Sequence, residues 1–249
     1  MKNYDSIDRI SPTIRPENAR LAQRQRWLDL LFLHWKVPVS MLRPLIPSAL
    51  EIDTFEGDAW VGVVPFTMRD VRPWWSPSVP GISNFHETNV RTYVHQYGQD
   101  PGVWFFSLDA ANALAVWIAR TFWNLPYHHA TMSLEKGVDG VIRYDTARRA
   151  STHSAECHAV YEPLGAPSPA KPATLEHFLA ERYILYADRG GGELRKGRVH
   201  HVPYPLQRAK LYSWDESLLV AAGIARPAGE PLAHYASGVD VDVFALEAL

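Results

Sequence analysis

The chain has 249 residues, of which 21% are charged, and its net charge is −2. This length suits one large β-rich domain or two small ones, and the near-neutral charge gives no reason to expect nucleic acid or an anionic membrane as a partner. The single cysteine, Cys157, excludes an internal disulfide and any site built from several cysteines.

The first 20 residues have the composition of a polar arm, because they contain Pro12 and Pro16 and few large apolar groups. Residues 1–26 contain no apolar signal core. No run of about 18 uncharged apolar residues is present to form a transmembrane helix. We therefore expect a cytoplasmic protein with an arm at 1–20 and a single domain over residues 21–249.

Beyond this arm, the first half of the chain contains mainly strand-like patterns. Residues 27–35 form a dense apolar run that is either a buried strand or a helix, since its periodicity does not distinguish the two. Residues 40–46 predict one short helical turn, closed by Pro47. Alternating runs predict strands at 58–68, 85–97 and 103–108, the last two joined by a turn at 98–102.

The clearest helical pattern covers residues 109–123. Asp109 or Asn112 can cap this helix. Its large apolar residues recur at helical spacing along one stripe, at Leu114, Trp117, Ile118 and Phe122. The predicted helix ends at a corner fixed by Pro126, after which strand-like alternation resumes.

The second half alternates strand-like runs with breaks. A proline-rich stretch at 162–172 predicts a linker, and Thr174 is a natural N-cap for a helix that runs toward Arg182. The other patterns predict strands at 129–135, 141–148 and 152–161, a hairpin of 183–187 with 194–201, a helix at 214–222 and a strand at 235–246. Many strands and few short helices indicate an α+β fold whose mainly antiparallel sheet is rolled or closed around a central cavity.

Several polar side chains alternate along residues 85–93. On a strand, one face carries Phe85, Glu87, Asn89, Arg91 and Tyr93. Such a face is either solvated, with an ordinary Glu–Arg pair, or it lines a polar cavity, and the pattern leaves both open. In the second case Glu87 and Arg91 project into a ligand pocket.

The corner after the predicted helix carries Arg120, six residues before Pro126, and then a phenol and two imidazoles. If a strand begins at the proline, Tyr127 and His129 share a face and His128 lies opposite. A buried tyrosine or histidine can donate a proton or bind a ligand oxygen, although backbone groups satisfy such side chains equally well.

This corner resembles that of the acetoacetate decarboxylase-like superfamily, in which an Arg-Glu pair precedes Pro-Lys-Lys and the first lysine forms a Schiff base. Arg120 and Pro126 keep the spacing. Thr121 stands in place of the glutamate, and Tyr127 and His128 stand in place of the two lysines. The resemblance therefore implies the fold of these enzymes without the amine that makes them decarboxylases.

Further matches widen the resemblance. The superfamily has an aromatic-x-Glu strand whose glutamate enters the active site, and Phe85-His86-Glu87 matches it. The set of matching segments looks like the YqjF-like family, an uncharacterised bacterial family grouped with the same fold. These segments are 27–35, 85–93, 104–109, 181–183 and 200–204, and the resemblance covers nearly the whole chain from about residue 24. It implies a fold and a cavity, but no particular reaction.

Other residues offer no substitute for the missing amine. Of the six lysines, Lys36 and Lys210 have apolar neighbours, but neither occupies the matched position. We therefore expect no Schiff-base decarboxylation. The sequence contains no His-x-His, no His-Glu-x-x-His and no glycine-rich phosphate loop, so we expect neither a metal nor a cofactor.

Three hypotheses follow for the function. The first is a protein that binds a small organic acid or aromatic ligand through Glu87, Arg91, Arg120, Tyr127 and His129. The second is a lysine-independent enzyme, such as a lyase, hydratase or tautomerase, that uses Glu87 with Tyr127 or His129 as acid and base. The third is a structural or interaction protein with a vestigial cavity, and the sequence also leaves a homo-oligomer open.

The pKa of Glu87 separates the first two hypotheses. Burial alone would raise this pKa and let the carboxyl group deliver a proton near pH 7, whereas pairing with Arg91 or Arg120 would lower it. Because two arginines are predicted near one glutamate, we expect the paired state and therefore favour binding.

Overall fold

The computed structural model describes the chain apart from residues 1–6, 114–115, 117–124, 150, 152–153 and 189–192. The strands are β1 (Leu21–Val37), β2 (Glu51–Ile52), β3 (Ala59–Pro73), β4 (Phe85–Gln96), β5 (Gln99–Ala110), β6 (Tyr127–Lys136), β7 (Ile142–Arg148), β8 (Glu156–Ser168), β9 (Ile184–Asp188), β10 (Leu194–His200), β11 (Leu206–Glu216), β12 (Leu232–Phe244) and β13 (Glu247–Ala248). The short helices are α1 (Val39–Leu42), α3 (Leu175–Ala180), α4 (Leu218–Ala221), η1 (Ser11–Thr13) and η2 (Arg43–Leu45).

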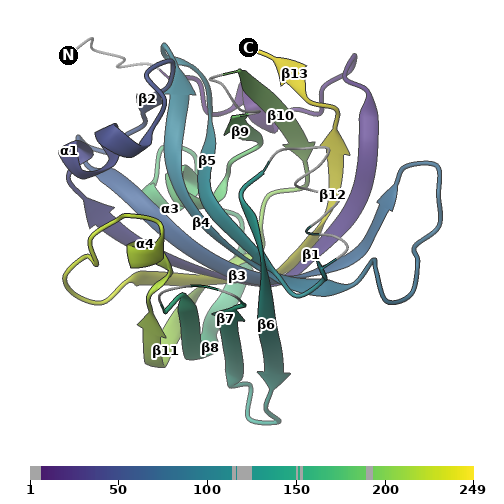
Figure 1. Ribbon diagram of the computed structural model, residues 1–249, viewed down its shortest axis with the longest axis vertical. Helices are drawn as coiled ribbons and strands as arrows, with labels where there is room; N and C mark the ends of the chain where they lie inside the picture. Colours follow the sequence, from purple (N-terminus) through teal and green to yellow (C-terminus); the bar gives the residue numbers. More distant parts are fainter. Residues whose placement is uncertain (1–6, 114–115, 117–124, 150, 152–153, 189–192) are drawn as a thin grey trace.

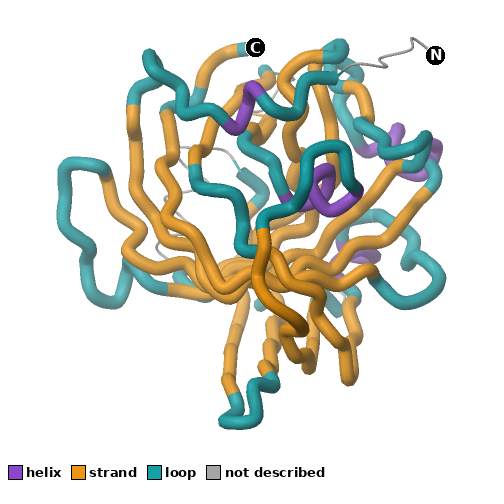
Figure 2. Tube along the Cα trace, turned by 180° about the vertical axis from the view of Figure 1, so that it is seen from behind, coloured by secondary structure: helices purple, strands orange, loops and turns teal. Residues whose placement is uncertain are grey.

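The described strands form one thirteen-stranded sheet, in the order β13-β10-β9-β5-β6-β7-β8-β11-β12-β1-β3-β4-β2. Neighbouring strands are antiparallel, except that β5 is parallel to both β6 and β9. Strands make up most of the chain trace and the helices are short turns (Figure 2). The fold is therefore the mainly antiparallel α+β fold that the sequence predicts.

Two additional pairings close this sheet on itself. β4 also pairs with β5, and β10 also pairs with β12, so two rings share the strands β12, β1, β3, β4 and β5. The ring completed by β9 and β10 is here called the upper ring. The ring completed by β6, β7, β8 and β11 is called the lower ring, after their places in Figure 1.

The shared strands supply side chains to both rings, because successive residues on a strand point to opposite faces. The hydrophobic core of the lower ring includes Leu31, Val63, Val90, Tyr144 and Tyr161. The core of the upper ring includes Leu30, Phe32, Val64, Phe66 and Val241. The run at 27–35 is therefore a strand, and it is mostly apolar because both of its faces are buried.

An irregularity in β1 sets which side chains face the upper ring. Asp29 has a φ of 55°, a conformation that aspartate tolerates better than branched residues, and it shifts the alternation by one residue. Opposite it on β12, Gly238 pairs with Leu28, and a Cβ atom at that position would lie 2.5 Å from the Trp27 carbonyl oxygen. Trp27 and Leu30 consequently both face the upper ring.

Some element boundaries differ from the sequence predictions. The turn predicted at 98–102 consists only of Tyr97 and Gly98, which both have positive φ, as a two-residue hairpin turn requires. The linker predicted at 162–172 is mostly strand, since β8 continues to Ser168 beside β11. Beyond Tyr161, no described strand pairs with β8 on its β7 side, and an edge of this kind accommodates prolines.

Two helix predictions also need correction. The helix predicted at 214–222 is the end of strand β11 followed by the single turn α4. Asp109, a proposed cap of the helix at 109–123, belongs to strand β5, and most of that predicted helix lies outside the described residues. The helix after Thr174 is confirmed as α3, where the Thr174 hydroxyl accepts a hydrogen bond from the His177 amide.

The N-terminal arm contacts the sheet before β1 begins at Leu21. Arg9 forms an ion pair with Asp53, and its guanidinium lies 5.2 Å from the centre of the Phe178 ring. Arg15 forms an ion pair with Asp242 on β12.

Within the described part of the chain, no helix has the length and apolar character needed to cross a membrane.

Candidate functional site

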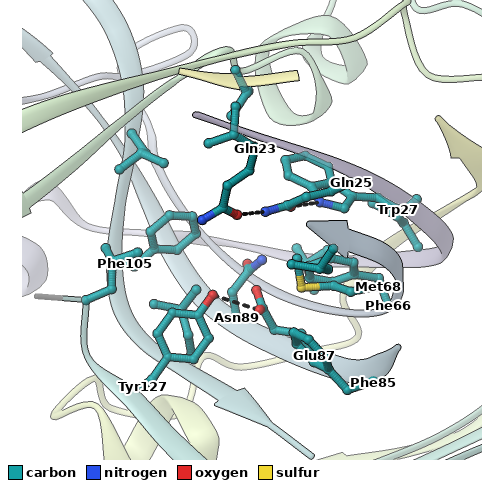
Figure 3. A pocket seen from close by; sticks show the side chains of 18 of the residues that line it. Gln23, Gln25, Trp27, Phe66, Met68, Phe85, Glu87, Asn89, Phe105 and Tyr127 are labelled. Atoms are coloured by element: carbon teal, nitrogen blue, oxygen red, sulfur yellow. Dashed lines mark hydrogen bonds between the residues drawn. The ribbon is translucent and has the colours of Figure 1, made fainter. Parts of the chain in front are cut away.

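A cavity of about 340 Å³ lies inside the upper ring (Figure 3). Its volume falls within the roughly 300–1,000 Å³ of typical small-molecule sites. The walls come from β1, β3, β4, β5, β9, β10 and β12, with Tyr127 from β6 and the loop between β3 and β4. Most lining residues are apolar, and the polar ones are Gln23, Gln25, Arg72, Ser83, Glu87, Asn89, Arg91, Tyr127, Arg182 and Tyr204.

Strand β4 contributes the central polar wall. Its side chains at Phe85, Glu87, Asn89 and Arg91 alternate along the strand and all line the cavity, as one of the two interpretations of the sequence proposed. Tyr93, the fifth member of that face, is fully buried beyond the cavity. Its phenol is 2.6 Å from His34 Nε2 and donates a hydrogen bond to the Leu179 carbonyl oxygen at 2.8 Å.

Glu87 and Tyr127 form a hydrogen-bonded pair on this wall. The parallel pairing of Leu108 with Tyr127 brings the start of β6 beside β5, and the Tyr127 hydroxyl donates to Glu87 Oε2 at 2.8 Å (Figure 3). Glu87 is only 3% exposed. Burial raises its pKa to about 8, with a smaller contribution from Asp109, while the hydrogen bond from Tyr127 acts in the opposite direction. The Glu87 carboxyl group is therefore mostly protonated at pH 7.

The ion pair expected between Glu87 and Arg91 does not form, and Arg120, the other arginine expected to pair with Glu87, lies outside the described residues. Arg91 Nη2 instead donates to the Leu179 carbonyl oxygen at 3.0 Å. Its guanidinium lies 5.5 Å from the Phe32 ring centre and 5.7 Å from that of Tyr93. The sequence prediction failed because residues four apart on a strand are well separated, so a shared face does not bring the two charges together.

Arg91 and Arg182 both line the cavity but differ in their electrostatic partners. Arg182 Nη1 is 2.8 Å from Asp53 Oδ2, so a buried carboxylate balances its charge. Arg91 is 8% exposed, and among the described residues no carboxylate lies within ion-pair distance of it. Its Nε is buried without a hydrogen-bond partner in that part of the chain. A buried charge in this state is costly unless a partner arrives.

The other polar groups on the wall differ in their hydrogen-bond partners among the described residues. Asn89 is 6% exposed, and its Oδ1 is buried with no hydrogen bond to any described residue. On β1, Trp27 Nε1 donates to Gln25 Oε1 at 2.9 Å, and Gln25 Nε2 donates to Gln23 Oε1 at 2.8 Å. The cavity therefore combines an apolar interior with a few fixed hydrogen-bonding groups, as small-molecule sites do.

The structure brings together three of the five predicted site residues, Glu87, Arg91 and Tyr127. His129 lies on β6, two residues beyond Tyr127, but it is not part of the cavity lining. Arg120 lies outside the described residues. The two glutamines of β1 were missed, although their spacing with Trp27 would have revealed a common face had this segment been predicted as a strand.

The lysines in the described part of the chain lie away from the cavity lining. Lys36 is exposed and pairs with Asp58. Lys210 is also exposed and lies 4.6 Å from the centre of the Tyr212 ring. Neither lysine with apolar neighbours therefore lines the cavity.

Residues 24–240 match the DUF2071 family, whose description is an uncharacterized conserved protein. The chain belongs to this family. The uncharacterized protein YqjF of Bacillus subtilis (strain 168) is 44% identical over 218 residues, which cover 88% of each chain. The resemblance to the YqjF-like family that the sequence indicated is thereby confirmed.

Solved structures with the same fold are acetoacetate decarboxylase-like proteins. An acetoacetate decarboxylase-like enzyme from Sphingomonas wittichii RW1 has a TM-score of 0.63 at 13% identity, with 92% of each chain covered. The enduracididine biosynthesis enzyme MppR complexed with pyruvate has a TM-score of 0.62 at 13% identity, covering 93% of this chain and 91% of MppR. Acetoacetate decarboxylase from Legionella pneumophila has a TM-score of 0.62 at 12% identity, covering 96% and 92%. At these identities the likeness establishes the fold alone.

Proposed function

We propose that this DUF2071 protein binds a small organic acid in the cavity of the upper ring, without covalent attachment. The observation that carries the proposal is Arg91, a buried cation on the cavity wall whose charge is balanced by no carboxylate among the described residues. A ligand carboxylate would supply the missing charge and satisfy Arg91 Nε, through hydrogen bonds of the strong, charge-assisted kind.

The state of Glu87 supports an anionic ligand. A charged carboxylate on the same wall would repel a ligand carboxylate, but burial raises the pKa of Glu87 to about 8 and keeps it neutral at pH 7. A protonated carboxyl group can donate a hydrogen bond, so Glu87 would bind a carbonyl or hydroxyl oxygen of the ligand while Tyr127 holds its Oε2. MppR, which shares the fold, has been solved in complex with pyruvate, a small keto acid.

Calorimetric titration with matched ligands tests this proposal. Pyruvate, acetoacetate and benzoate are titrated at pH 7, with benzamide as the uncharged counterpart of benzoate. Wild type should prefer benzoate to benzamide. Arg91→Met should lose most of this preference, by roughly 10- to 100-fold for a charge-assisted hydrogen bond.

Lys210→Met is the control, since it removes one exposed positive charge that does not line the cavity. Unchanged benzoate affinity in Arg91→Met, or equal losses in both variants, would refute the role of Arg91 as the counterion.

A second candidate function is acid–base catalysis, and it depends on the raised pKa of Glu87. A neutral carboxyl group with a pKa of about 8 can deliver a proton at neutral pH, and Tyr127 lies within hydrogen-bonding distance of it. Tautomerisation or lyase chemistry on a bound keto acid would exchange a ligand C–H proton with solvent. Proton NMR in deuterium oxide should then show exchange that is faster with wild type than with Glu87→Gln. Identical exchange rates for both proteins would exclude this second candidate, and ligand binding would be the only function still proposed.

Schiff-base chemistry is the alternative that both proposals reject. The sequence resemblance aligns Tyr127 with the superfamily's lysine, and the described lysines do not line the cavity. Borohydride treatment in the presence of acetoacetate should therefore leave the protein mass unchanged. A lysine adduct found by peptide mass spectrometry would overturn this expectation.

A further inference from the structure

Three side chains of β1 form a chain of hydrogen bonds along the cavity wall. Gln23, Gln25 and Trp27 alternate on one face, with Trp27 Nε1 bonded to Gln25 and Gln25 bonded to Gln23 (Figure 3). Trp27 is held in place by an edge-on contact with Phe66 and a tilted contact with His201, at ring-centre distances of 5.8 and 5.9 Å. The tryptophan is thus the fixed end of the chain.

The chemistry of the indole fixes the direction of every bond in this chain. Trp27 Nε1 can only donate, so Gln25 must turn its amide oxygen toward it. Gln25 then presents its NH₂ group to Gln23, whose amide oxygen accepts. The amide orientation of a glutamine is ordinarily ambiguous, but here each one follows from its neighbour.

The consequence is an oriented donor at the free end of the chain. The Gln23 NH₂ group points into the cavity, and no described residue accepts a hydrogen bond from it (Figure 3). Packing accounts for Trp27, which lies against the core of the upper ring. It does not account for two glutamines whose amide chain ends with a donor in an apolar cavity.

The strand register places this donor and Arg91 at different levels of the same cavity wall. Gln23 pairs with Pro73 on β3, whereas Arg91 pairs with Gly62 on the same strand. Glu87, which pairs with Phe66, lies between these two levels. A ligand bound to Arg91 by its carboxylate would therefore extend past Glu87 toward Gln23.

We propose that the Gln23–Gln25–Trp27 chain selects organic acids that carry a hydrogen-bond acceptor, such as a carbonyl oxygen, at the end remote from the carboxylate. Gln23 is the specificity-determining residue that contacts the ligand, and Gln25 and Trp27 position its amide. The inference rests on the proposed function, because Arg91 must hold the carboxylate for the far end to reach Gln23.

Three substituted benzoates provide the test. 4-Acetylbenzoate and 4-isopropylbenzoate have nearly the same shape but differ in one acceptor oxygen, and unsubstituted benzoate reports on the carboxylate subsite alone. Calorimetry with wild type should show about fivefold tighter binding of the acetyl than of the isopropyl compound, the value of one neutral hydrogen bond.

The variants distinguish recognition from packing. Gln23→Leu should abolish the preference for the acetyl compound and leave benzoate affinity unchanged. Trp27→Phe keeps an aromatic ring but removes the orienting donor, so it should weaken the same preference while benzoate still binds. Thermal melting of each variant verifies its fold. If Gln23→Leu is unstable, Gln23→Met replaces it in the same titrations.

The outcomes separate this inference from the function on which it rests. If wild type binds benzoate but shows no acetyl preference, or if Gln23→Leu retains that preference, the chain is a packing feature and the inference is wrong while acid binding stands. If wild type binds none of the three acids, both the proposed function and this inference fail.

Discussion

On one face of β4, Thr88 and Thr92 bury hydroxyl groups that are hydrogen-bonded inside the lower ring, whereas on the other face Asn89 and Arg91 bury polar atoms without partners among the described residues. The Thr88 hydroxyl lies 3.0 Å from the Tyr144 hydroxyl, and the Thr92 hydroxyl donates to the Trp60 carbonyl oxygen at 2.7 Å. The four β4 residues Thr88, Asn89, Arg91 and Thr92 are all less than 9% exposed. Both faces of β4 are therefore buried, and they differ in whether their buried polar atoms have hydrogen-bond partners.

This difference separates a structural strand face from a candidate site. A buried polar atom without a hydrogen bond costs roughly 1–3 kcal/mol, so a native protein has few of them. The lower ring avoids the cost at Thr88 and Thr92 by pairing each hydroxyl with a neighbour. The upper ring bears it at Asn89 and Arg91, beside a cavity of about 340 Å³. A ligand in the cavity could form the missing hydrogen bonds and so remove this cost.

The largest effect is expected from Glu87→Gln on the pH dependence of stability. The pKa of Glu87 is raised from 4.5 to about 8, so between these values the native protein holds a proton that the unfolded chain has released. The native state binds more protons in this window, and its stability must fall as pH rises through it. Below pH 4.5 both states are protonated and the effect vanishes; above pH 8 the full loss persists.

Urea unfolding at pH 5 and pH 8 measures this effect. At 1.36 kcal/mol per pKa unit, wild type should lose roughly 3 kcal/mol relative to Glu87→Gln between the two pH values. Glu230→Gln, at an exposed position, controls for the loss of one carboxyl group. Parallel pH profiles for wild type and Glu87→Gln would show that the cavity does not keep this group neutral.

A smaller, crossed effect is expected when one residue is changed on each face of β4. Thr88→Val removes a satisfied buried hydrogen bond and should cost about 1 kcal/mol of unfolding free energy without affecting benzoate binding. Arg91→Met removes a buried charge that has no counterion among the described residues, so stability should be unchanged or increased while benzoate binding is lost. The Leu179 carbonyl oxygen remains satisfied in this variant, because it also accepts from Tyr93.

Unfolding titrations without ligand, together with calorimetry, provide both values for each variant. A large stability loss in Arg91→Met with intact binding would reverse the assignment of the two faces. It would make Arg91 a structural residue.

The sequence predicted the polar face of β4 because strand alternation is a local property. Every second residue of this segment faces the cavity, at Phe85, Glu87, Asn89 and Arg91. The match of Phe85-His86-Glu87 to the superfamily indicated the same face. The partners of these side chains were not predictable in this way. Asp53, 129 residues from Arg182 in the chain, neutralises that arginine, and no comparable residue reaches Arg91 among those described.

The features that the sequence did not predict, strand β11 and the two glutamines of β1, depend on strands that are distant in the chain. Strand β11 carries exposed side chains such as Arg208, Lys210 and Tyr212, so it shows little apolar pattern and depends on pairing with β8 and β12. Gln23 and Gln25 have the composition of a solvated segment. They become cavity residues only because β12 and β3 flank β1 on both sides.

The smallest effect concerns two tyrosines that contact Glu87 from opposite faces of β4. Tyr127 donates to the Glu87 side chain, and this hydrogen bond lowers the pKa of the carboxyl group against the larger effect of burial. Tyr144 donates instead to the Glu87 backbone oxygen at 3.1 Å, from within the lower ring. Tyr127→Phe should therefore raise the pKa of Glu87 further, by up to about one unit for a hydrogen bond of about 1.4 kcal/mol.

Tyr144→Phe is the matched control, since it removes the same phenol oxygen on the other face and should leave the pKa of the Glu87 carboxyl group in place. Carbon-13 NMR titration of labelled glutamate side chains measures both shifts. A lower pKa in Tyr127→Phe would mean that the phenol stabilises the neutral rather than the charged carboxyl group. Tyr127 would then accept a hydrogen bond from the protonated carboxyl group, and the pair would be arranged to transfer a proton to a ligand rather than to hold one in place.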